Sequence, residues 1–304
     1  MLERILIIGV GLIGSSIARA IKKYNISQEI YGLDSNENVL EKSAELQILS
    51  DSNKNIEELD KQVDLIIICS PVGTYKDIFS SLNKFVKKET LVTDVGSTKI
   101  SVINDFKKYC NNENIKFVPG HPIAGLEKSG PEYGFAELFE NRFCILTPLD
   151  KDKDNDVTTK IKSFWEKLGM KVEIMNPEYH DRVLAMTSHV PQLIAYSIVF
   201  TANELEDHLK NEVLKYSAAG FRDFTRLAGS DPIMWRDIYS KNKDAVIEML
   251  GRFTEDLTTL QKAIRNNDSK FLEDTFSSTK KIRKIIEELG QAGSFDPREK
   301  NKKN

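Results

Sequence analysis

His121 is the residue best suited by its surroundings to proton chemistry. The chain has four histidines, and this one lies between Gly120 and Pro122, directly after the apolar stretch 115–119. An imidazole between a glycine and a proline contributes little to core packing, so a structural role does not explain it. A histidine can, however, accept a proton near neutral pH. An enzyme that oxidises an alcohol by hydride transfer needs an acceptor for the hydroxyl proton. We therefore predict that His121 is a general base, with a loop histidine bonded to backbone as the alternative.

Ser97 is a second candidate, because it ends the neighbouring apolar stretch 90–96. Its hydroxyl group is suited to orient the imidazole of His121. It is equally suited to cap the helix that begins near Thr98, and the two roles are compatible. We predict a catalytic role for Ser97 beside His121.

The other three histidines are less promising. His180 and His208 lie among acidic residues, so we expect both at the surface. His189 precedes Pro191, which should kink a long helix. Taken by itself, His189 is predicted to be a core histidine rather than a ligand.

Two arginines supply the cationic chemistry. Arg222 and Arg226 are four residues apart, so they share one face of a helix. A guanidinium group binds a carboxylate through two parallel hydrogen bonds, which suits an anionic substrate. The alternative is a solvated charged face with ion pairs to Asp223.

A glycine-rich turn near the N-terminus predicts a dinucleotide site. The motif Gly9-x-Gly11-x-x-Gly14 follows an apolar strand and precedes a helical pattern, and the next strand, 29–33, ends in Asp34. The first glycine allows a tight turn, the second lets the backbone approach a pyrophosphate, and the third allows close packing of helix on strand. The phosphates would lie on the unpaired N–H groups at the start of the helix. The carboxylate of Asp34 would bind the ribose hydroxyl groups and repel a 2′-phosphate, which favours NAD over NADP.

Further strands alternate with helical patterns, so we predict an α/β fold with a Rossmann-type, doubly wound and mostly parallel sheet. Ligands of such sheets bind beyond the carboxyl ends of the strands. The expected strands are 3–8, 29–33, 63–69, 90–96, 115–119, 142–147 and 171–175, with a helix over 156–168. The predicted cofactor contacts at their ends are Gly9, Gly11, Leu12, Ile13, Gly14, Asp34, Ser70, Pro71, Val72, Asp94 and Gly96.

The second half of the sequence has helical periodicity only. Asn176 and Pro177 are typical of an N-cap and a first helical turn, and no convincing strand follows. We predict an NAD-binding domain over 1–175, an all-helical substrate and dimerisation domain over 176–294, and a flexible tail over 295–304. The helical domain should close one side of the cofactor cleft and pair two copies of the chain.

Composition excludes several function classes. The net charge of −3 gives no electrostatic argument for nucleic acid or an anionic membrane surface. The longest apolar run, around Leu65–Cys69, is too short to span a bilayer. The three cysteines are scattered, no metal-ligand cluster is visible, and no signal peptide precedes the first strand. We expect a cytoplasmic protein without a metal.

Five sequence blocks in this order resemble those of the prephenate dehydrogenase family, over roughly residues 3 to 260. They are the glycine turn, Asp94–Lys99, Gly120–Gly125, Ser188–Pro191, and Phe224–Arg226 with Asp231-Pro232-x-x-Trp235. The resemblance implies a Rossmann-type domain with a helical dimerisation domain, and hence a homodimer. It implies NAD-dependent oxidative decarboxylation of prephenate to 4-hydroxyphenylpyruvate and CO₂ in tyrosine biosynthesis. Tyrosine is then a candidate feedback inhibitor.

The resemblance also implies roles for individual residues. His121 would bind the ring hydroxyl group and accept its proton, and Ser97 would hold both. Arg226 would bind a substrate carboxylate. The remaining residues implied around the pocket and its mouth are His189, Trp235, Arg222, Asp223 and Glu127.

Gln192 departs from the family pattern. Many members carry a histidine there, in S-H-x-P-H. Glutamine can donate to a carbonyl or carboxylate group but cannot change charge near pH 7. The departure leaves arogenate, or both compounds as for a cyclohexadienyl dehydrogenase, as the alternative substrate.

Two other function classes fit the sequence less well. A 3-hydroxyacid dehydrogenase would use a helical lysine, and Lys210 and Lys215 lack the usual glycine and asparagine context. A non-catalytic NAD-sensing module would keep the glycine turn but would have no reason to keep His121, Ser97 and Arg226 together.

Overall fold

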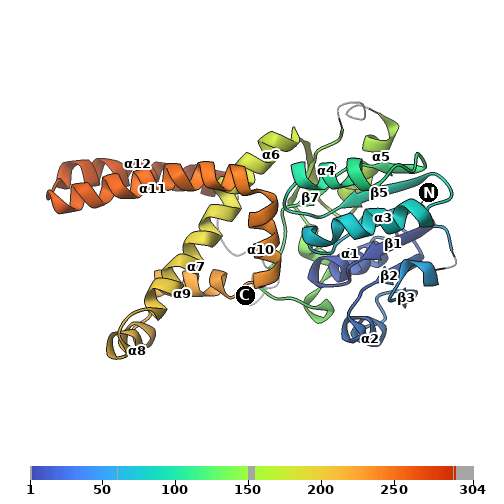
Figure 1. Ribbon diagram of the computed structural model, residues 1–304, viewed down its shortest axis with the longest axis horizontal. Helices are drawn as coiled ribbons and strands as arrows, with labels where there is room; N and C mark the ends of the chain where they lie inside the picture. The colour runs from blue at the N-terminus through green and yellow to red at the C-terminus, as the bar shows by residue number, and fades with distance from the viewer. Residues whose placement is uncertain (1, 60, 150–154, 290, 292–304) are drawn as a thin grey trace.

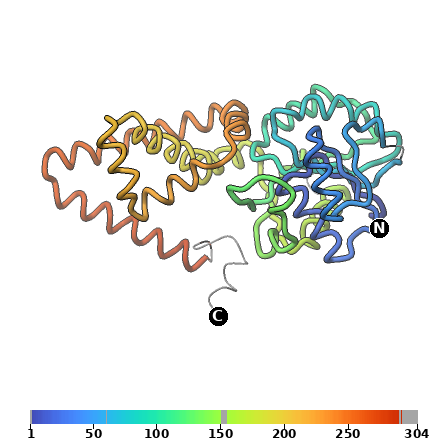
Figure 2. Tube along the Cα trace, turned by 90° about the horizontal axis from the view of Figure 1, so that it is seen from below, coloured from blue at the N-terminus to red at the C-terminus, as the bar shows by residue number. Residues whose placement is uncertain are grey.

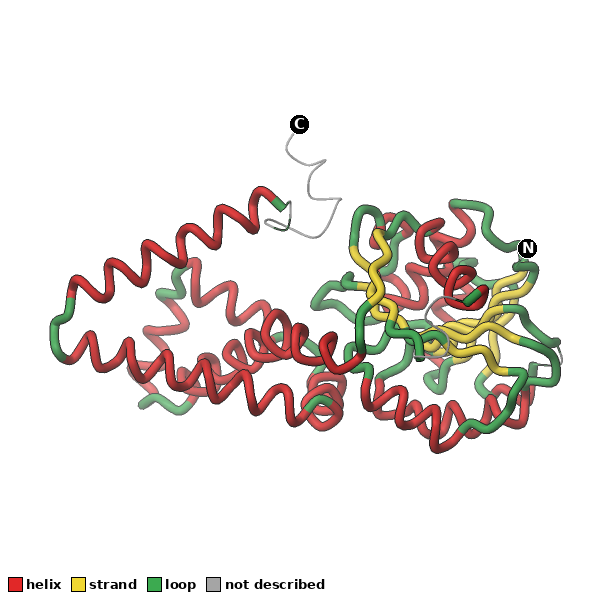
Figure 3. Tube along the Cα trace, turned by 90° about the horizontal axis from the view of Figure 1, so that it is seen from above, coloured by secondary structure: helices red, strands yellow, loops and turns green. Residues whose placement is uncertain are grey.

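The computed structural model describes residues 2–59, 61–149, 155–289 and 291. Two lobes lie beside each other, an α/β lobe that carries the N-terminus and a lobe of helices (Figures 1 and 2). All strands of the described residues belong to the first lobe (Figure 3). The predicted tail, 295–304, lies outside the described residues.

The α/β lobe is built on a six-stranded sheet with the order β3-β2-β1-β4-β5-β6, and every pair is parallel. Central strands such as β4, Leu-Ile-Ile-Ile, are buried on both faces, as continuous apolar runs predict. This order reverses direction between β1 and β4, which opens a crevice at their carboxyl ends. The strands are β1 (Arg4–Ile8), β2 (Glu29–Leu33), β3 (Asp51–Asn53), β4 (Leu65–Ile68), β5 (Thr90–Asp94) and β6 (Ile115–Phe117).

Apolar clusters fill both faces of this sheet and confirm the predicted doubly wound class. One cluster contains Ile5, Ile7 and Trp165, and the other contains Leu6 and Phe79. The helices of this lobe are α1 (Leu12–Lys23), α2 (Glu37–Glu45), α3 (Tyr75–Phe85), α4 (Ile100–Tyr109) and α5 (Asp156–Lys167).

A second, three-stranded sheet corrects the prediction for the stretch around His121. The predicted strand 115–119 with His121 beyond its end is wrong, because β6 ends at Phe117 and residues 120–122 form a strand of their own. Pro119 has no N–H group and cannot continue the ladder. This sheet consists of β7 (Gly120–Pro122), antiparallel to β8 (Phe143–Leu146), which is parallel to β9 (Lys171–Ile174).

The helical lobe begins where it was predicted to begin. The side chain of Asn176 accepts hydrogen bonds from the N–H groups of Glu178 and Tyr179, which caps α6. The irregularity predicted at Pro191 is a π-helical turn, Ala185–His189, directly before the helix that carries this proline in its first turn. The helices are α6 (Pro177–Leu184), α7 (Val190–Asn203), α8 (Asp207–Lys215), α9 (Ala219–Ala228), α10 (Pro232–Lys241), α11 (Lys243–Arg265) and α12 (Ser269–Glu288).

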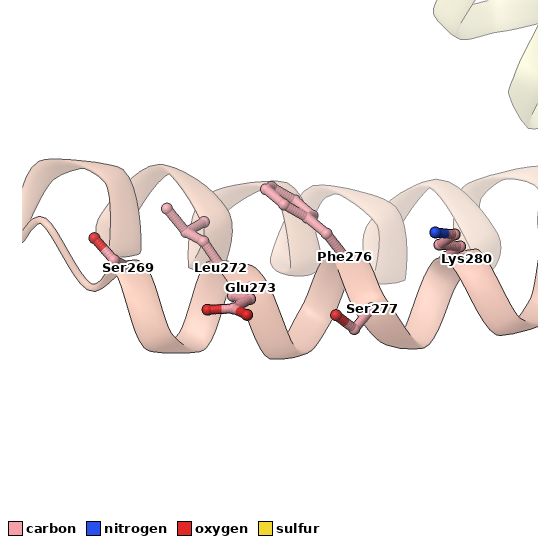
Figure 4. Close-up of a pocket in the computed structure, with 6 residues that line it drawn as sticks. All are labelled: Ser269, Leu272, Glu273, Phe276, Ser277 and Lys280. Atoms are coloured by element: carbon pink, nitrogen blue, oxygen red, sulfur yellow. The ribbon is translucent and has the colours of Figure 1, made fainter.

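The hairpin of α11 and α12 extends away from the α/β lobe (Figures 1 and 3). Within α12 none of the described residues is buried, and Phe276 and Ile282 are 55% and 56% exposed. Figure 4 shows Leu272 and Phe276 on one face of α12, with polar side chains beside them. Such a long apolar stripe is typical of a surface that another chain covers.

The continuous helical run Pro177–Asn203 is long and apolar enough to cross a membrane, by length and composition alone. The expectation that the longest apolar run lies at β4 is therefore wrong. In the structure the run packs against α9 and α11, and it carries the buried polar residues His180, Asp181 and Gln192. These contacts are those of the central helix of the lobe.

Candidate active site

The glycine turn fits the phosphates of a dinucleotide. Gly9 has φ of +91°, a left-handed conformation that favours glycine. A Cβ atom on Gly14 would lie 2.1 Å from the carbonyl oxygen of Gly9, so this glycine is required by packing. A Cβ atom on Gly11 would meet nothing within 4 Å. The space over Gly11 is therefore open to a ligand, at the start of a helix whose N-cap makes no side-chain hydrogen bond.

Asp34 lies at the carboxyl end of β2, next to this turn. Its carboxylate accepts hydrogen bonds from the N–H groups of Val10, at 2.9 Å, and Asn36, at 3.0 Å. These bonds leave lone pairs on both oxygens, so the carboxylate can still accept from ribose hydroxyl groups. The geometry agrees with the predicted contact of Asp34 with the cofactor.

Asp94 was predicted to contact the cofactor, but its side chain lies inside the protein. The residue is fully buried, and its carboxylate accepts from Lys99 Nζ at 2.7 Å, the Tyr75 hydroxyl group at 3.1 Å and the Gly96 N–H group at 2.8 Å. The N–H group of Gly120 also donates to it, at 3.0 Å. Since its oxygens are occupied and no surface is exposed, the side chain is unavailable to a cofactor. It instead ties the end of β5 to the start of β7.

Lys99 completes this buried ion pair. Its ammonium group has no exposure, and besides the carboxylate of Asp94 it donates to the carbonyl oxygen of Gly120. A buried charge is tolerated when it is paired and hydrogen-bonded. The pair fixes the residue that precedes His121 in the chain.

His121 lies in a chain of hydrogen bonds that crosses from one lobe to the other. Its Nδ1 is 2.9 Å from Nε2 of His180, and Nδ1 of His180 is 2.8 Å from a carboxylate oxygen of Asp181. His180 and Asp181 belong to α6, the first helix of the helical lobe. The prediction that His180 is a surface residue is wrong, because its side chain has no exposure. The prediction for His208 is confirmed, since 80% of its side chain is exposed.

Burial keeps the imidazole of His121 neutral. Desolvation lowers the pKa of His121 well below its ordinary value, and the neighbouring His180, Lys99 and His189 lower it further. Burial likewise lowers the pKa of His180, against the opposing effect of Asp181. At neutral pH His121 can therefore accept a proton, as a general base must.

His189 presents an unused donor. The amide nitrogen of Asn242 can only donate, and it lies 3.1 Å from Nδ1 of His189, which must accept. Burial lowers the pKa of His189 to about 4, so the neutral ring carries its proton on Nε2. Among the described residues this buried Nε2 has no partner, nor has Nε1 of Trp235, whose ring lies 6.1 Å from that of His189.

Arg226 reaches across to the α/β lobe. Its guanidinium group forms an ion pair with Glu127, which lies in the loop after β7, and lies 3.9 Å from the carboxylate of Asp223. The side chain is 54% exposed. Arg222, on the same helix, is exposed. The structure thus brings together Arg226, Glu127 and Asp223, as the resemblance implied.

Among the described residues, no hydrogen bond links Ser97 or Gln192 to His121. Ser97 is half-buried two residues before Lys99, and in the described part of the chain the hydrogen-bond partner of the His121 ring is His180 instead. Gln192 is buried, and its amide group donates to the carbonyl oxygen of Leu227 at 2.7 Å. This bond ties α7 to α9 and leaves the amide oxygen for other donors.

The sequence contained a signal for the two residues that were missed. Helical spacing from the capped start of α6 places His180 on the same face as Leu184, and Asp181 on the same face as Ala185. Leu184 and Ala185 are buried. The periodicity therefore indicated two buried polar side chains, whereas the acidic neighbours in sequence suggested a surface position.

Two family models match the chain. The one described as the nucleotide-binding domain of prephenate dehydrogenase matches residues 17–174, and the one described as its dimerization domain matches residues 176–278. The chain is 37% identical to a cyclohexadienyl dehydrogenase of Zymomonas mobilis, over 92% of this chain and 95% of that protein. It is 34% identical to a prephenate dehydrogenase of Bacillus subtilis, over 93% of this chain and 76% of that protein.

A solved structure has the same architecture. The crystal structure of prephenate dehydrogenase from Aquifex aeolicus, in complex with hydroxyphenyl propionate and NAD⁺, matches with a TM-score of 0.86 and 35% identity. The match covers 94% of this chain and 99% of that one. Both lobes are therefore shared.

Proposed function

The chain belongs to the prephenate dehydrogenase family, and we propose that it oxidises and decarboxylates prephenate to 4-hydroxyphenylpyruvate and CO₂. The family confirms the enzyme class and cofactor predicted from the sequence, an oxidoreductase that uses NAD. Membership of this family also argues against the two alternative functions, a 3-hydroxyacid dehydrogenase and an NAD-sensing module. The observation that carries the proposal is the buried, neutral imidazole of His121 at the junction of the nucleotide lobe and the helical lobe.

NAD, when bound, supplies the acceptor for the hydride of the ring carbon that bears the hydroxyl group. Nε2 of His121 takes the hydroxyl proton as the carbonyl group forms. The bond to the ring carboxylate then breaks, its electron pair enters the ring, and CO₂ leaves. The ring becomes aromatic, and its phenolate oxygen takes the proton back from His121, so the base ends the cycle unchanged. Aromatisation drives the step, and the protein has to position the reactants and grip carboxylates.

The groups that bind the substrate would come from the helical lobe. A guanidinium group has five N–H donors, and the ion pair with Glu127 leaves several of those of Arg226 free for a substrate carboxylate. Trp235 and His189 add two buried N–H donors without partners among the described residues. These groups remain the proposed substrate contacts, with Ser97 beside the reacting hydroxyl group and Gln192 near the side chain.

The unused donors support prephenate over arogenate. The pyruvyl side chain of prephenate carries a keto oxygen and a carboxylate, all acceptors, whereas the alanyl side chain of arogenate carries an ammonium group, a donor. A buried N–H group left facing a donor costs about 1–3 kcal/mol. The 37% identical relative named cyclohexadienyl dehydrogenase supports the alternative, use of both compounds.

Formation of NADH from prephenate and from arogenate, measured in parallel by absorbance, tests the proposal. We expect kcat/KM for prephenate to exceed that for arogenate at least tenfold, in line with a mispaired buried donor. Equal values would support dual specificity, and turnover of neither compound would contradict the proposal. Parallel assays with tyrosine test the proposed feedback inhibition.

The assembly and location are proposed on the same basis. Residues 176–278 match a dimerization domain, and α12 exposes apolar side chains along its length. We propose a homodimer through the helical lobe, residues 176–294, in the cytoplasm. Sedimentation of the purified protein at several concentrations checks the first part.

A further inference from the structure

A buried carboxylate anchors one end of the hydrogen-bond chain at His121. The two oxygens of Asp181 accept from the N–H groups of Lys99, at 2.8 Å, and Ile100, at 3.0 Å, at the start of α4. One of them also lies 2.8 Å from Nδ1 of His180. Every neighbour is a donor, and the helix start favours negative charge. Asp181 is therefore an ionised acceptor, and Nδ1 of His180 must carry a proton.

The protonation of each following nitrogen is then determined. A neutral His180 with a proton on Nδ1 has its lone pair on Nε2, the atom 2.9 Å from Nδ1 of His121. That lone pair accepts, so Nδ1 of His121 carries the proton of the neutral ring. The basic lone pair of His121 then lies on Nε2, which points away from His180.

We propose that His180 and Asp181 are positioning residues that hold His121 in the Nδ1–H tautomer and stabilise the imidazolium formed when its Nε2 accepts a proton. The tautomer follows from the hydrogen-bond geometry around a neutral His180, whereas the second role rests on the proposed function. A free imidazole in water favours the opposite tautomer, with the proton on Nε2. Left to itself, His121 would place a proton where the reaction needs a lone pair.

The charges around His121 explain why the stabilisation is needed. The ammonium group of Lys99 lies fully buried nearby and repels an imidazolium. Asp94 already neutralises Lys99, at 2.7 Å. Asp181 is the carboxylate linked to His121 through His180, so it offsets the positive charge that forms on the base. An aspartate has this function towards histidine in serine proteases, where it also fixes the tautomer.

The chain of hydrogen bonds ends inside the protein. His180 has no exposure and Asp181 is 1% exposed, and the backbone oxygen of Asp181 accepts from Asn242 at 2.8 Å. A proton that entered this chain could not leave through it. This agrees with the proposed cycle, in which the base returns its proton to the product. The arrangement therefore orients and stabilises the base and is not a route to solvent.

The arrangement also depends on how the lobes meet. His121 lies on β7 of the α/β lobe, while His180 and Asp181 lie on α6 of the helical lobe. The tautomer of the base is thus set only when the two lobes are in contact.

The tautomer can be read directly by nitrogen NMR. Long-range ¹H–¹⁵N correlation of the full-length protein distinguishes Nδ1–H from Nε2–H rings, and the chain has only four histidines to assign. We expect His121 as the Nδ1–H tautomer at pH 7. Observation of the Nε2–H tautomer in the wild-type protein would overturn the inference, whatever its activity.

Variants distinguish an effect on the His121 tautomer from a general effect on packing. Asp181→Asn should lower kcat about a hundredfold, with substrate KM changed less than threefold, and should give a mixture of His121 tautomers. His180→Gln retains an oxygen that can accept from Nδ1 of His121, so it should keep the tautomer and lose about tenfold in kcat. The exposed histidine variant His208→Gln is the matched control and should match the wild type.

The outcomes distinguish this inference from the proposed function. An unchanged kcat and tautomer in Asp181→Asn would overturn the inference while leaving the function intact. A wild-type protein with the expected tautomer and no turnover of prephenate or arogenate would contradict the function and leave the hydrogen-bond chain standing. If Asp181→Asn fails to fold, the tautomer of the wild-type protein and the kcat of His180→Gln still test the inference.

Discussion

The cofactor end and the proton-transfer end of the site are built in different ways. At Gly9–Gly14 the protein offers backbone and open space, and a Cβ atom at Gly11 would touch nothing. At His121 it offers buried side chains from two lobes, joined by hydrogen bonds of 2.9 and 2.8 Å. The first end is made from one local segment. The second exists only when strands and helices distant in sequence have packed together.

This difference determines which part of the site the sequence could predict. The spacing of Gly9, Gly11 and Gly14 specified strand, turn and helix at once, and β1 and β2 lie close to their predicted bounds. The start of α6 at Asn176 was predicted for the same reason, since capping is local. The family blocks then identified the chemistry.

The contacts around His121 could not be predicted in this way. His180 is 59 residues from His121, and Asp181 is 82 residues from Lys99. Acidic neighbours in sequence suggested a surface position for His180, but tertiary packing buried it. Asp94 was predicted to contact the cofactor because it ends a strand, yet Lys99 and Tyr75 occupy its carboxylate. Local spacing carries no information about such partners.

The sharpest test of the proton-transfer end is His121→Asn. We expect kcat to fall at least about a hundredfold, a typical loss for a general base, because asparagine cannot accept the hydroxyl proton. The dissociation constant for NAD, measured by fluorescence titration, should stay within about twofold, since the glycine turn is untouched. Retained turnover would show that another group is the base.

Arg226→Ala tests the helical side of the site. Loss of a guanidinium group that binds a carboxylate should raise KM for prephenate at least about tenfold, with a smaller change in kcat. The matched control is Arg252→Ala, an arginine of α11 whose side chain is 67% exposed and pairs with Glu248. If the two variants have the same KM, Arg226 does not bind the substrate.

Two glycine variants distinguish an effect on NAD binding from an effect on stability at the glycine turn. Gly11→Ala should leave the free energy of unfolding within about 0.5 kcal/mol of wild type but weaken NAD binding about tenfold, since its Cβ atom would enter open space used by phosphates. Gly14→Ala should lose about 2 kcal/mol of stability, because its Cβ atom would lie 2.1 Å from a carbonyl oxygen. Urea unfolding and NAD titration measure both quantities. Unchanged NAD affinity in Gly11→Ala would contradict the assigned phosphate site.

The buried histidines should make stability depend on pH. The pKa values of His121, His180 and His189 are lowered by burial, the last to about 4, so below pH 6.5 the unfolded chain binds protons that the folded protein does not. Stability should therefore be full above about pH 6.5 and fall towards pH 4, by up to about 1.4 kcal/mol per pH unit for each histidine. Urea unfolding at pH 7 and pH 5 measures the loss. His208→Gln, at a side chain that is 80% exposed, is the control and should lose stability in parallel with the wild type.

A crystal structure with NAD and 4-hydroxyphenylpyruvate tests the central claim most directly. We expect the phenol oxygen of this product within hydrogen-bond distance, about 3 Å, of Nε2 of His121, beside the nicotinamide ring. Nδ1 of His121 should keep its hydrogen bond to His180. An imidazole turned away from the nicotinamide ring, with the phenol oxygen on another group, would contradict the account.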